Sequence, residues 1–167
     1  MTKDSASRQE ERANQILGAA AVVFAEQGFD AARMDDIAQV AGLSKGSLYW
    51  YFESKESLTL ELLRRILARQ LEQLQQLPTT QGSISEHCLS LLRQFIDDLA
   101  SQPYLVPLVL EFYALAARHN DARQLFRDFF HQYNETLAVF ITQGIECGEF
   151  RPVPVTTIIN SITALFE

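Results

Sequence analysis

Residues 34–55, MDDIAQVAGLSKGSLYWYFESK, constrain the fold of this 167-residue chain more than any other stretch. Apolar residues recur at helical spacing in the first half, and Gly42 and Ser44 then place a permissive residue and a good helix N-cap in succession. The pattern predicts a helix, a tight turn and a second helix from Ser44 to about Tyr51. A helix this short is not stable alone, so it has to pack on other helices.

The second, short helix has two different faces. Leu48 and Phe52 are four residues apart and form an apolar side that faces a core. The opposite side carries small, basic, hydroxylated and aromatic groups, which suit insertion into the major groove of DNA. We expect one of the two tyrosines there to be partly buried. The candidate DNA contacts on and beside this helix are Ser44, Lys45, Gly46, Ser47, Tyr49, Trp50, Tyr51 and, through a phosphate, Lys55.

The stretch AGLSKGSLYWYFESKESL resembles the helix-turn-helix signature of the tetracycline-repressor (TetR) family of bacterial transcriptional regulators. Upstream, ILGAAAVVFAEQGFDAARMDDIA resembles the first helix of that family, its Gly-aromatic turn (28–29) and its Asp-Ile-Ala run (36–38). Two positions differ. The usual Thr before the second helix is Arg33, which removes an N-cap, and we expect Arg33 to offset this by reaching a phosphate. The frequent His is Trp50, so base preference does not carry over.

The resemblance implies an all-α protein in two parts. Residues 1–54 would form a helix-turn-helix DNA-binding domain, and residues 55–167 a helical domain for ligand binding and dimerisation. The implied function is a ligand-responsive repressor, a homodimer that a small hydrophobic or aromatic effector releases from a palindromic operator. TetR-like regulators carry another helix beyond the stripe at 155–166. We therefore expect either that residues are missing after it or that the dimer uses less surface.

Composition supports a helical protein and raises a question about DNA binding. Apolar residues make up 47% of the chain, with only 7 Gly and 5 Pro, and the periodicity near 3.6 residues indicates helices. The net charge is −7, and residues 1–55 carry six basic against eight acidic side chains, a net −2. The basic groups must therefore gather on one face, and DNA binding should depend strongly on salt. Arg8 and Arg12 are either phosphate contacts or ordinary solvated charges.

The remaining periodicity predicts the helix boundaries. Residues 1–10 are polar and expected to fray. A capping box, Ser83-Ile84-Ser85-Glu86, opens the fifth helix, and Gly148 is expected to stop the seventh. The loop at 78–82 and the break at 102–103 separate other helices. The predicted helices are 11–27, 34–40, 44–51, 55–77 (with Ser54 as N-cap), 83–101, 104–117 (with Pro107 in its first turn), 120–147 and one from about 155.

Two features of the second part bear on ligand binding. The helix at 104–117 is apolar nearly all round, so it should be buried, with Glu111 in its middle. Glu111 either holds a cationic or hydrogen-bonding ligand, or it pairs with Arg118, Arg123 or another Arg or faces solvent at a groove; we favour the second interpretation, without a ligand. The aromatic stripe at 125–145 is either core or the lining of an apolar pocket. The candidate ligand-binding residues are Phe95, Glu111, Phe112, Tyr113, Phe126, Phe130 and Tyr133.

Two other classes of function compete with the regulator. One is a helical small-molecule sensor or carrier that has lost specific DNA reading. The net negative charge of residues 1–55 and the missing Thr before the second helix favour this alternative. The other is an enzyme, for which no nucleophile with a base, metal-ligand spacing or phosphate-binding loop appears, so we expect no catalytic residue, cofactor or metal. Cys88 and Cys147 are expected to be unpaired. A polar N-terminus and no long apolar run predict a cytoplasmic protein without a membrane partner.

Overall fold

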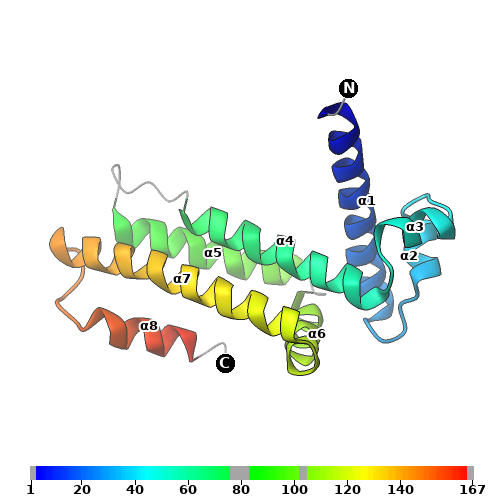
Figure 1. Ribbon diagram of the computed structural model, residues 1–167. Coiled ribbons are helices and arrows are strands. Elements are labelled where there is room, and N and C mark those ends of the chain that lie inside the picture. The colour runs from blue at the N-terminus through cyan, green and yellow to red at the C-terminus, as the bar shows by residue number, and fades with distance from the viewer. Residues whose placement is uncertain (1–2, 76–82, 102–104, 165–167) are drawn as a thin grey trace. The chain divides into compact units, whose positions relative to one another are not determined.

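The computed structural model describes residues 3–75, 83–101 and 105–164, and these form helices and no strand (Figure 1). The predicted all-α fold is confirmed. Across these ranges every helix falls short of the length and apolar character that a bilayer span requires. Expectations for 1–2, 76–82, 102–104 and 165–167 lie outside the described residues. The helices are α1 (Lys3–Gln27), α2 (Met34–Val40), α3 (Lys45–Tyr51), α4 (Lys55–Gln75), α5 (Ile84–Ser101), α6 (Leu105–Arg118), α7 (Asn120–Glu146) and α8 (Val155–Thr163).

The start of α1 corrects a prediction. Within the described residues the helix begins at Lys3, so the expectation of a frayed N-terminus is wrong for residues 3–10. Within its first turns, the Ser7 hydroxyl donates a hydrogen bond to the Glu11 carboxylate, four residues later, at 3.3 Å. Side-chain pairs three and four residues apart stabilise a helix without core packing. The side chains from 6 to 12 are all exposed, so this part of α1 contributes no side chain to the core.

Packing divides the chain into two compact units. The head unit is Met1–Arg64 with Ser101–His119, and the body unit is Arg65–Ala100 with Asn120–Glu167. The helix α4 runs from the first unit into the second, and α6 belongs to the head unit. The expected functional boundary between residues 54 and 55 remains a prediction.

The core of the head unit fixes where α3 lies. Burying an aliphatic or aromatic side chain contributes about 1.5–3 kcal/mol, and α3 contributes Leu48, which is fully buried. This anchor determines which side of α3 faces outward. The other side chains of this core that are no more than 2% exposed include Ile16, Ala20, Val23, Ile37, Leu58, Leu63, Leu108, Phe112 and Leu115.

The surroundings of α6 also differ from expectation. Leu108, Phe112 and Leu115, at spacings of four and three, are buried and form one face. The opposite side exposes Val106 and, at 65%, Leu110, so the prediction that α6 is buried nearly all round is wrong. Because apolar residues occupy almost every position of this helix, its sequence carries no periodicity that marks the buried side.

The N-terminus of α5 is capped from a distant part of the body unit. Ser83 Oγ accepts the Glu86 N–H at 3.3 Å, so the predicted cap residue is confirmed. The capping carboxylate comes from Glu149, which accepts N–H groups of Ile84 and Ser85 at 3.0 and 2.9 Å and the Ser83 hydroxyl at 2.6 Å. These bonds, led by that from Ser83, lower the pKa of Glu149 to about 2. The carboxylate thus anchors the segment after α7 to the start of α5.

The connection between α7 and α8 is close-packed. Gly148 has a φ of 77°, in the left-handed region that favours glycine, so the predicted helix stop is confirmed. The Phe150 N–H donates to the Gly144 carbonyl at 2.9 Å, and the Phe150 ring fills the space where a Cβ of residue 144 would lie. Across the pair, Thr163 Oγ1 donates to Asn134 at 2.9 Å.

Candidate nucleic-acid interface

The turn between α2 and α3 is closed by backbone bonds. Gly42 has a φ of 65°, which glycine adopts without strain, and the Leu43 N–H donates to the Ala38 carbonyl at 2.9 Å. Ser44 Oγ accepts the Ser47 N–H at 3.1 Å, which confirms the predicted N-cap. The first turn of α3 is therefore held in a fixed direction from α2.

The two faces predicted for α3 are present. Leu48 is fully buried and Phe52 is 8% exposed, whereas Tyr49 is 40% and Trp50 69% exposed. Tyr51 is half-buried beside Trp50, with ring centroids 4.7 Å apart in an edge contact, as expected for one of the tyrosines. The residues from 44 to 47 are exposed. The outer face therefore presents hydroxyl, ammonium and aromatic groups to solvent, which are the groups that binding in a major groove would use.

Lys45 is charged and lies on this outer face. Its Nζ is 2.8 Å from a carboxylate oxygen of Asp35, and both side chains are more than half exposed. The hydrogen bond to Asp35, followed by its charge, raises the pKa of Lys45. The ammonium also lies 5.9 Å from the ring centroid of Tyr49. An exposed pair of this kind contributes little to stability, so Lys45 can exchange Asp35 for a phosphate or a base at small cost.

Arg33 occupies the N-cap position of α2. An Arg side chain has no acceptor, so it cannot replace the cap that Thr would supply. Asp36 provides a compensating bond, because its carboxylate accepts the Arg33 N–H at 3.2 Å. The Arg33 side chain is exposed, and its phosphate contact remains a prediction.

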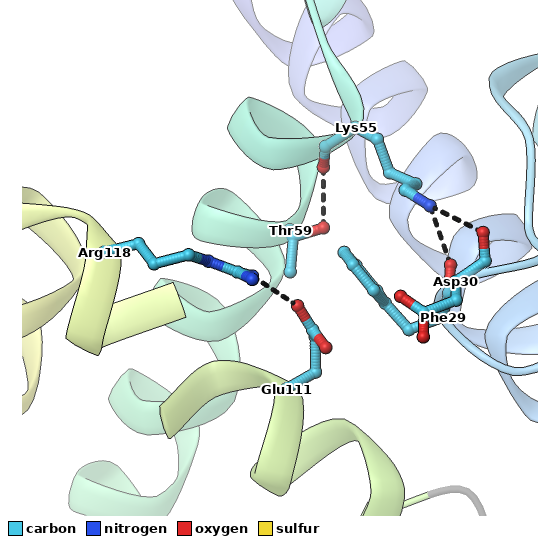
Figure 2. A network of polar contacts seen from close by, with 6 residues as sticks. All are labelled: Phe29, Asp30, Lys55, Thr59, Glu111 and Arg118. Carbon is cyan, nitrogen blue, oxygen red and sulfur yellow. Dashed lines mark hydrogen bonds and ion pairs between the residues drawn. The ribbon is translucent and has the colours of Figure 1, made fainter. Parts of the chain in front are cut away.

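Lys55 corrects another prediction. Its Nζ donates to the carbonyl oxygens of Phe29 at 2.7 Å, Ala32 at 3.1 Å and Asp30 at 3.3 Å, and it lies 4.4 Å from the Phe29 ring centroid. Figure 2 shows the side chain reaching toward residues 29 and 30. An ammonium group has three N–H donors, and these contacts use all of them. The expected orientation toward a phosphate is therefore wrong, and Lys55 instead ties the start of α4 to the loop after α1.

Serine side chains cap the N-terminus of α4, as predicted. Ser54 Oγ accepts the Ser57 N–H at 3.1 Å, which confirms the N-cap. In return, Ser57 Oγ accepts the Ser54 N–H at 3.1 Å. One turn further, the fully buried Thr59 satisfies its hydroxyl by donating to the Lys55 carbonyl at 2.6 Å. The cap and the lysine together fix the junction between α3 and α4.

A hollow of about 800 Å³ lies beside α3, between it and α1. Its lining includes Arg8 and Arg12 of α1 and Trp50 and Tyr51 of α3. Gln15, which the sequence did not single out, donates to the Ala41 carbonyl at 2.7 Å and so ties α1 to the turn before α3. That contact joins residues 26 positions apart, and no local pattern indicates it. The hollow is lined by Arg8, Gln9, Glu11, Arg12, Gln15, Trp50 and Tyr51.

Comparison with known proteins agrees with this geometry. A family profile described as "Bacterial regulatory proteins, tetR family" matches residues 16–62, the segment that holds α2 and α3. A second, "Tetracyclin repressor-like, C-terminal domain", matches residues 91–167. The chain is 31% identical over 164 residues to YfiR of Bacillus subtilis, an uncharacterised HTH-type transcriptional regulator, covering 93% of this chain and 77% of YfiR. The chain belongs to the TetR family of bacterial regulatory proteins.

Other transcriptional regulators are similar to this chain along most of its length. KstR2 of Mycobacterium tuberculosis, an HTH-type transcriptional repressor, is 34% identical over 158 residues, covering 84% of this chain and 70% of KstR2. The solved structure of FadR from Bacillus subtilis in complex with stearoyl-CoA has a TM-score of 0.70 at 24% identity, covering 91% of this chain and 81% of that one. As a member of the TetR family, the chain is a ligand-responsive DNA-binding transcriptional regulator.

The ligand-binding candidates of this TetR-family chain on α6 lie in the head unit. Phe112 is 2% exposed and belongs to the core, and Tyr113 is half-buried. Glu111 pairs with Arg118 at 3.1 Å, as Figure 2 shows, and is 16% exposed. The favoured interpretation of Glu111, an ion pair with Arg118, is confirmed.

The candidates on α7 lie in the body unit. Phe126 and Phe130 stack with centroids 6.2 Å apart, and Phe129 joins Phe130 to Tyr133 through contacts of 5.3 and 5.4 Å. These rings are half-buried and form one continuous aromatic ladder. The Phe95 side chain lies outside what the structure describes. Contact of any of these residues with an effector remains a prediction.

Proposed function

We propose that this TetR-family regulator is a repressor that binds a two-fold symmetric operator as a homodimer. The observation that carries the proposal is α3, anchored by the buried Leu48 with Tyr49 and Trp50 exposed on the other side. A helix of seven residues reads only a few base pairs, so specificity across a genome requires two half-sites. Those half-sites are separated by about 34 Å, one turn of DNA, or by a multiple of it.

Each exposed group of α3 has a role in this proposal. Lys45 contacts a guanine edge or a phosphate, and Tyr49 donates to a base or a phosphate. Trp50 packs on a thymine methyl group or a sugar. Ser44, Ser47 and Tyr51 donate to phosphates or bases, Gly46 allows close approach of the backbone, and Arg33 holds a phosphate. Lys55 acts indirectly, by fixing the junction between α3 and α4.

We further propose that the effector is a small hydrophobic or aromatic compound. The aromatic ladder of α7 supplies apolar surface for it. The FadR structure shows that another protein of this fold holds stearoyl-CoA. Glu111 is engaged by Arg118, which speaks against a cationic ligand at that carboxylate.

Effector binding acts through α4, which continues from the head unit into the body unit. An effector that binds one setting of α4 more tightly shifts the population toward that setting. If that setting does not fit the operator, DNA affinity falls by the ratio of the two effector affinities, typically 5- to 150-fold. The protein acts in the cytoplasm in this proposal and needs no cofactor.

The test compares DNA flanking the protein's own gene with a scrambled duplex of the same composition in a mobility-shift assay. The proposal expects the flanking DNA to bind at least about 10³-fold more tightly. Small apolar, aromatic and cationic compounds are then screened by thermal shift, and those that stabilise the protein are tested for release of DNA. Equal affinity for both duplexes would contradict the regulator and favour a sensor or carrier that does not read DNA.

A further inference from the structure

The ammonium group of Lys45 is held at the outer face of the helix-turn-helix by Asp35 of α2. Its Nζ lies 2.8 Å from Oδ1 and 2.9 Å from Oδ2 of that carboxylate, so both oxygens contact the same nitrogen. The two residues are ten positions apart and come from the two helices of the motif. The pair therefore links the start of α2 to the start of α3, the helix that is proposed to enter the major groove.

The positions of both residues in their helices favour this pair. Asp35 is in the first turn of α2, where the positive end of a helix stabilises an acidic side chain. Lys45 is the first residue of α3, where the same helix-end charge is unfavourable for a cation. Asp35 supplies the opposite charge, and its hydrogen bond, followed by its charge, raises the pKa of Lys45. Lys45 therefore stays a charged donor whose charge is balanced by its partner.

The paired ammonium group of Lys45 can still donate a hydrogen bond. An ammonium group has three N–H donors, and the two contacts to one carboxylate occupy at most two of them. At least one donor is therefore left for a further acceptor. The Tyr49 ring centroid lies 5.9 Å from Nζ, so this donor is next to another side chain of the outer face. More than half of each side chain of the pair is exposed, so a DNA groove can reach it.

The pair discriminates between the two kinds of acceptor that DNA offers. O6 and N7 of guanine are uncharged acceptors in the major groove, and Lys45 can donate to them while it keeps Asp35. A phosphate carries a full negative charge, which the adjacent carboxylate of Asp35 repels. Lys45 must therefore leave Asp35 to bind a phosphate, but it can bind a guanine without leaving. The cost of leaving is small at an exposed site, and only the phosphate contact incurs it.

We propose that Asp35 is a specificity-determining residue, which directs Lys45 to a guanine edge and away from the phosphates. The inference rests on the proposed DNA binding and deepens it, because it selects one of the two roles open to Lys45. Asp35 is a positioning residue in this assignment and acts on DNA through Lys45. It lowers the affinity for DNA of any sequence and thereby raises the preference for an operator.

The test measures how the full chain binds labelled flanking and scrambled duplexes, by fluorescence anisotropy at several salt concentrations. Asp35→Asn removes the charge and keeps the shape of the side chain. Asp36→Asn is the matched control, because Asp36 is the next residue of α2 and accepts the Arg33 N–H instead of binding Lys45. Lys45→Met, alone and combined with Asp35→Asn, shows whether the effect of Asp35 depends on Lys45.

Asp35→Asn should bind the scrambled duplex about two- to fivefold more tightly per protomer, because an exposed pair no longer has to break. The released ammonium group then neutralises a phosphate, so the salt slope on that duplex should steepen by about 0.9 per protomer. The flanking duplex should gain less, so the preference for it falls. In the Lys45→Met protein, Asp35→Asn should have no more effect than Asp36→Asn. A gain in affinity cannot arise from misfolding.

A second measurement identifies the base that Lys45 contacts. Each guanine of the flanking duplex is replaced in turn by 7-deazaguanine, which lacks the N7 acceptor. At one position in each half-site this should lower the affinity of the wild-type protein by about two- to tenfold, roughly half the free energy of a bidentate contact. The same replacement should leave the affinity of the Lys45→Met protein unchanged. Absence of any such position would contradict the assignment of Lys45 to a guanine.

Three further results would overturn the role of Asp35. One is a gain on the scrambled duplex that Asp36→Asn matches, which would indicate a general effect of charge. Another is unchanged binding of both duplexes by Asp35→Asn. The third is a loss confined to the flanking duplex that persists in the Lys45→Met protein, which would make Asp35 itself the acceptor of a cytosine amino group. In each case, preference of the wild-type protein for the flanking duplex would leave the proposed function intact. Absence of that preference in the wild-type protein would refute the function itself.

Discussion

Lys55 concentrates several contacts of the head unit in one ammonium group. It bonds three carbonyl oxygens of the loop between α1 and α2. Replacing it by methionine keeps the aliphatic stem and removes the donors. We expect Lys55→Met to lower the free energy of unfolding by about 2 kcal/mol, because hydrogen bonds to charged groups are among the stronger ones.

The same variant separates a structural role from a phosphate contact. Because Nζ points at the loop, the salt slope of DNA binding should stay at its wild-type value once the protein is folded. Chemical denaturation gives the stability, and anisotropy of labelled duplex across salt gives the slope. A fall of about 0.9 in slope with unchanged stability would assign Lys55 to a phosphate after all.

Tyr49 tests base reading at a single residue. Its ring is exposed on α3 while the neighbouring Leu48 is buried. We expect Tyr49→Ala to weaken binding to the flanking duplex by about 1–3 kcal/mol more than binding to a scrambled duplex. Tyr49→Phe is the control that retains the ring and loses the hydroxyl. If Tyr49→Ala lost the same amount of affinity for both duplexes, Tyr49 would not be a residue that reads bases.

The cap of α5 predicts an acid dependence of stability. The pKa of Glu149 is about 2 in the folded protein, below its ordinary value of 4.5. Between those values the unfolded chain binds more protons, so stability falls as pH falls. The contribution is complete above about pH 5 and is lost on approach to pH 2.

The matched variant for this cap is Glu149→Gln. It should be less stable than the wild-type protein at pH 7, because an amide is a weaker acceptor for the N–H groups of α5. Its stability should also change less between pH 5 and 2, so the two curves converge in acid. Denaturant titrations at several pH values measure this. A constant difference across that range would show that the Glu149 charge does not stabilise the cap.

Two helical glycines form a matched pair for testing close packing. A Cβ at Gly144 would collide with the Phe150 ring, whereas one at Gly18 would meet nothing within 4 Å. We expect Gly144→Ala to destabilise the chain by about 1–3 kcal/mol through overpacking. Gly18→Ala should stabilise it by about 0.5–1 kcal/mol, because alanine favours helix. Similar effects of both changes in thermal unfolding would contradict the packing of Phe150.

Features set by neighbouring residues could be predicted from the sequence. The N-caps at Ser44 and Ser54 and the stop at Gly148 depend on side chains within a few residues, and all three are confirmed. The turn and the two faces of α3 follow from local spacing in the same way. These are the features that position the candidate DNA-binding residues.

Features that join distant segments could not be predicted. Lys55 bonds a loop more than twenty residues away, and Glu149 caps a helix more than sixty residues away. The sequence indicated a charged residue at each position but not its partner. On α6, apolar residues on every side concealed which face is buried. In each case tertiary packing selects one of several locally acceptable arrangements.

In the proposed function, a DNA-binding head is joined to an effector-responsive body. A net charge of −7 opposes general attraction to DNA, so affinity has to come from specific groups on one face. In the proposed homodimer this face occurs twice, so its selectivity for a two-fold site is squared. The effector then needs only to change how well the outer α3 faces of the two protomers fit the two half-sites at the same time.

The most direct test of this account titrates the full chain with duplexes carrying the flanking DNA and follows Trp50 emission. Trp50 is 69% exposed in the free protein, so contact with DNA should change its emission strongly. We expect a change that saturates at two chains per duplex, and a scrambled duplex should require a far higher concentration. An unchanged emission, or equal responses to both duplexes, would contradict the placement of α3 in a DNA groove.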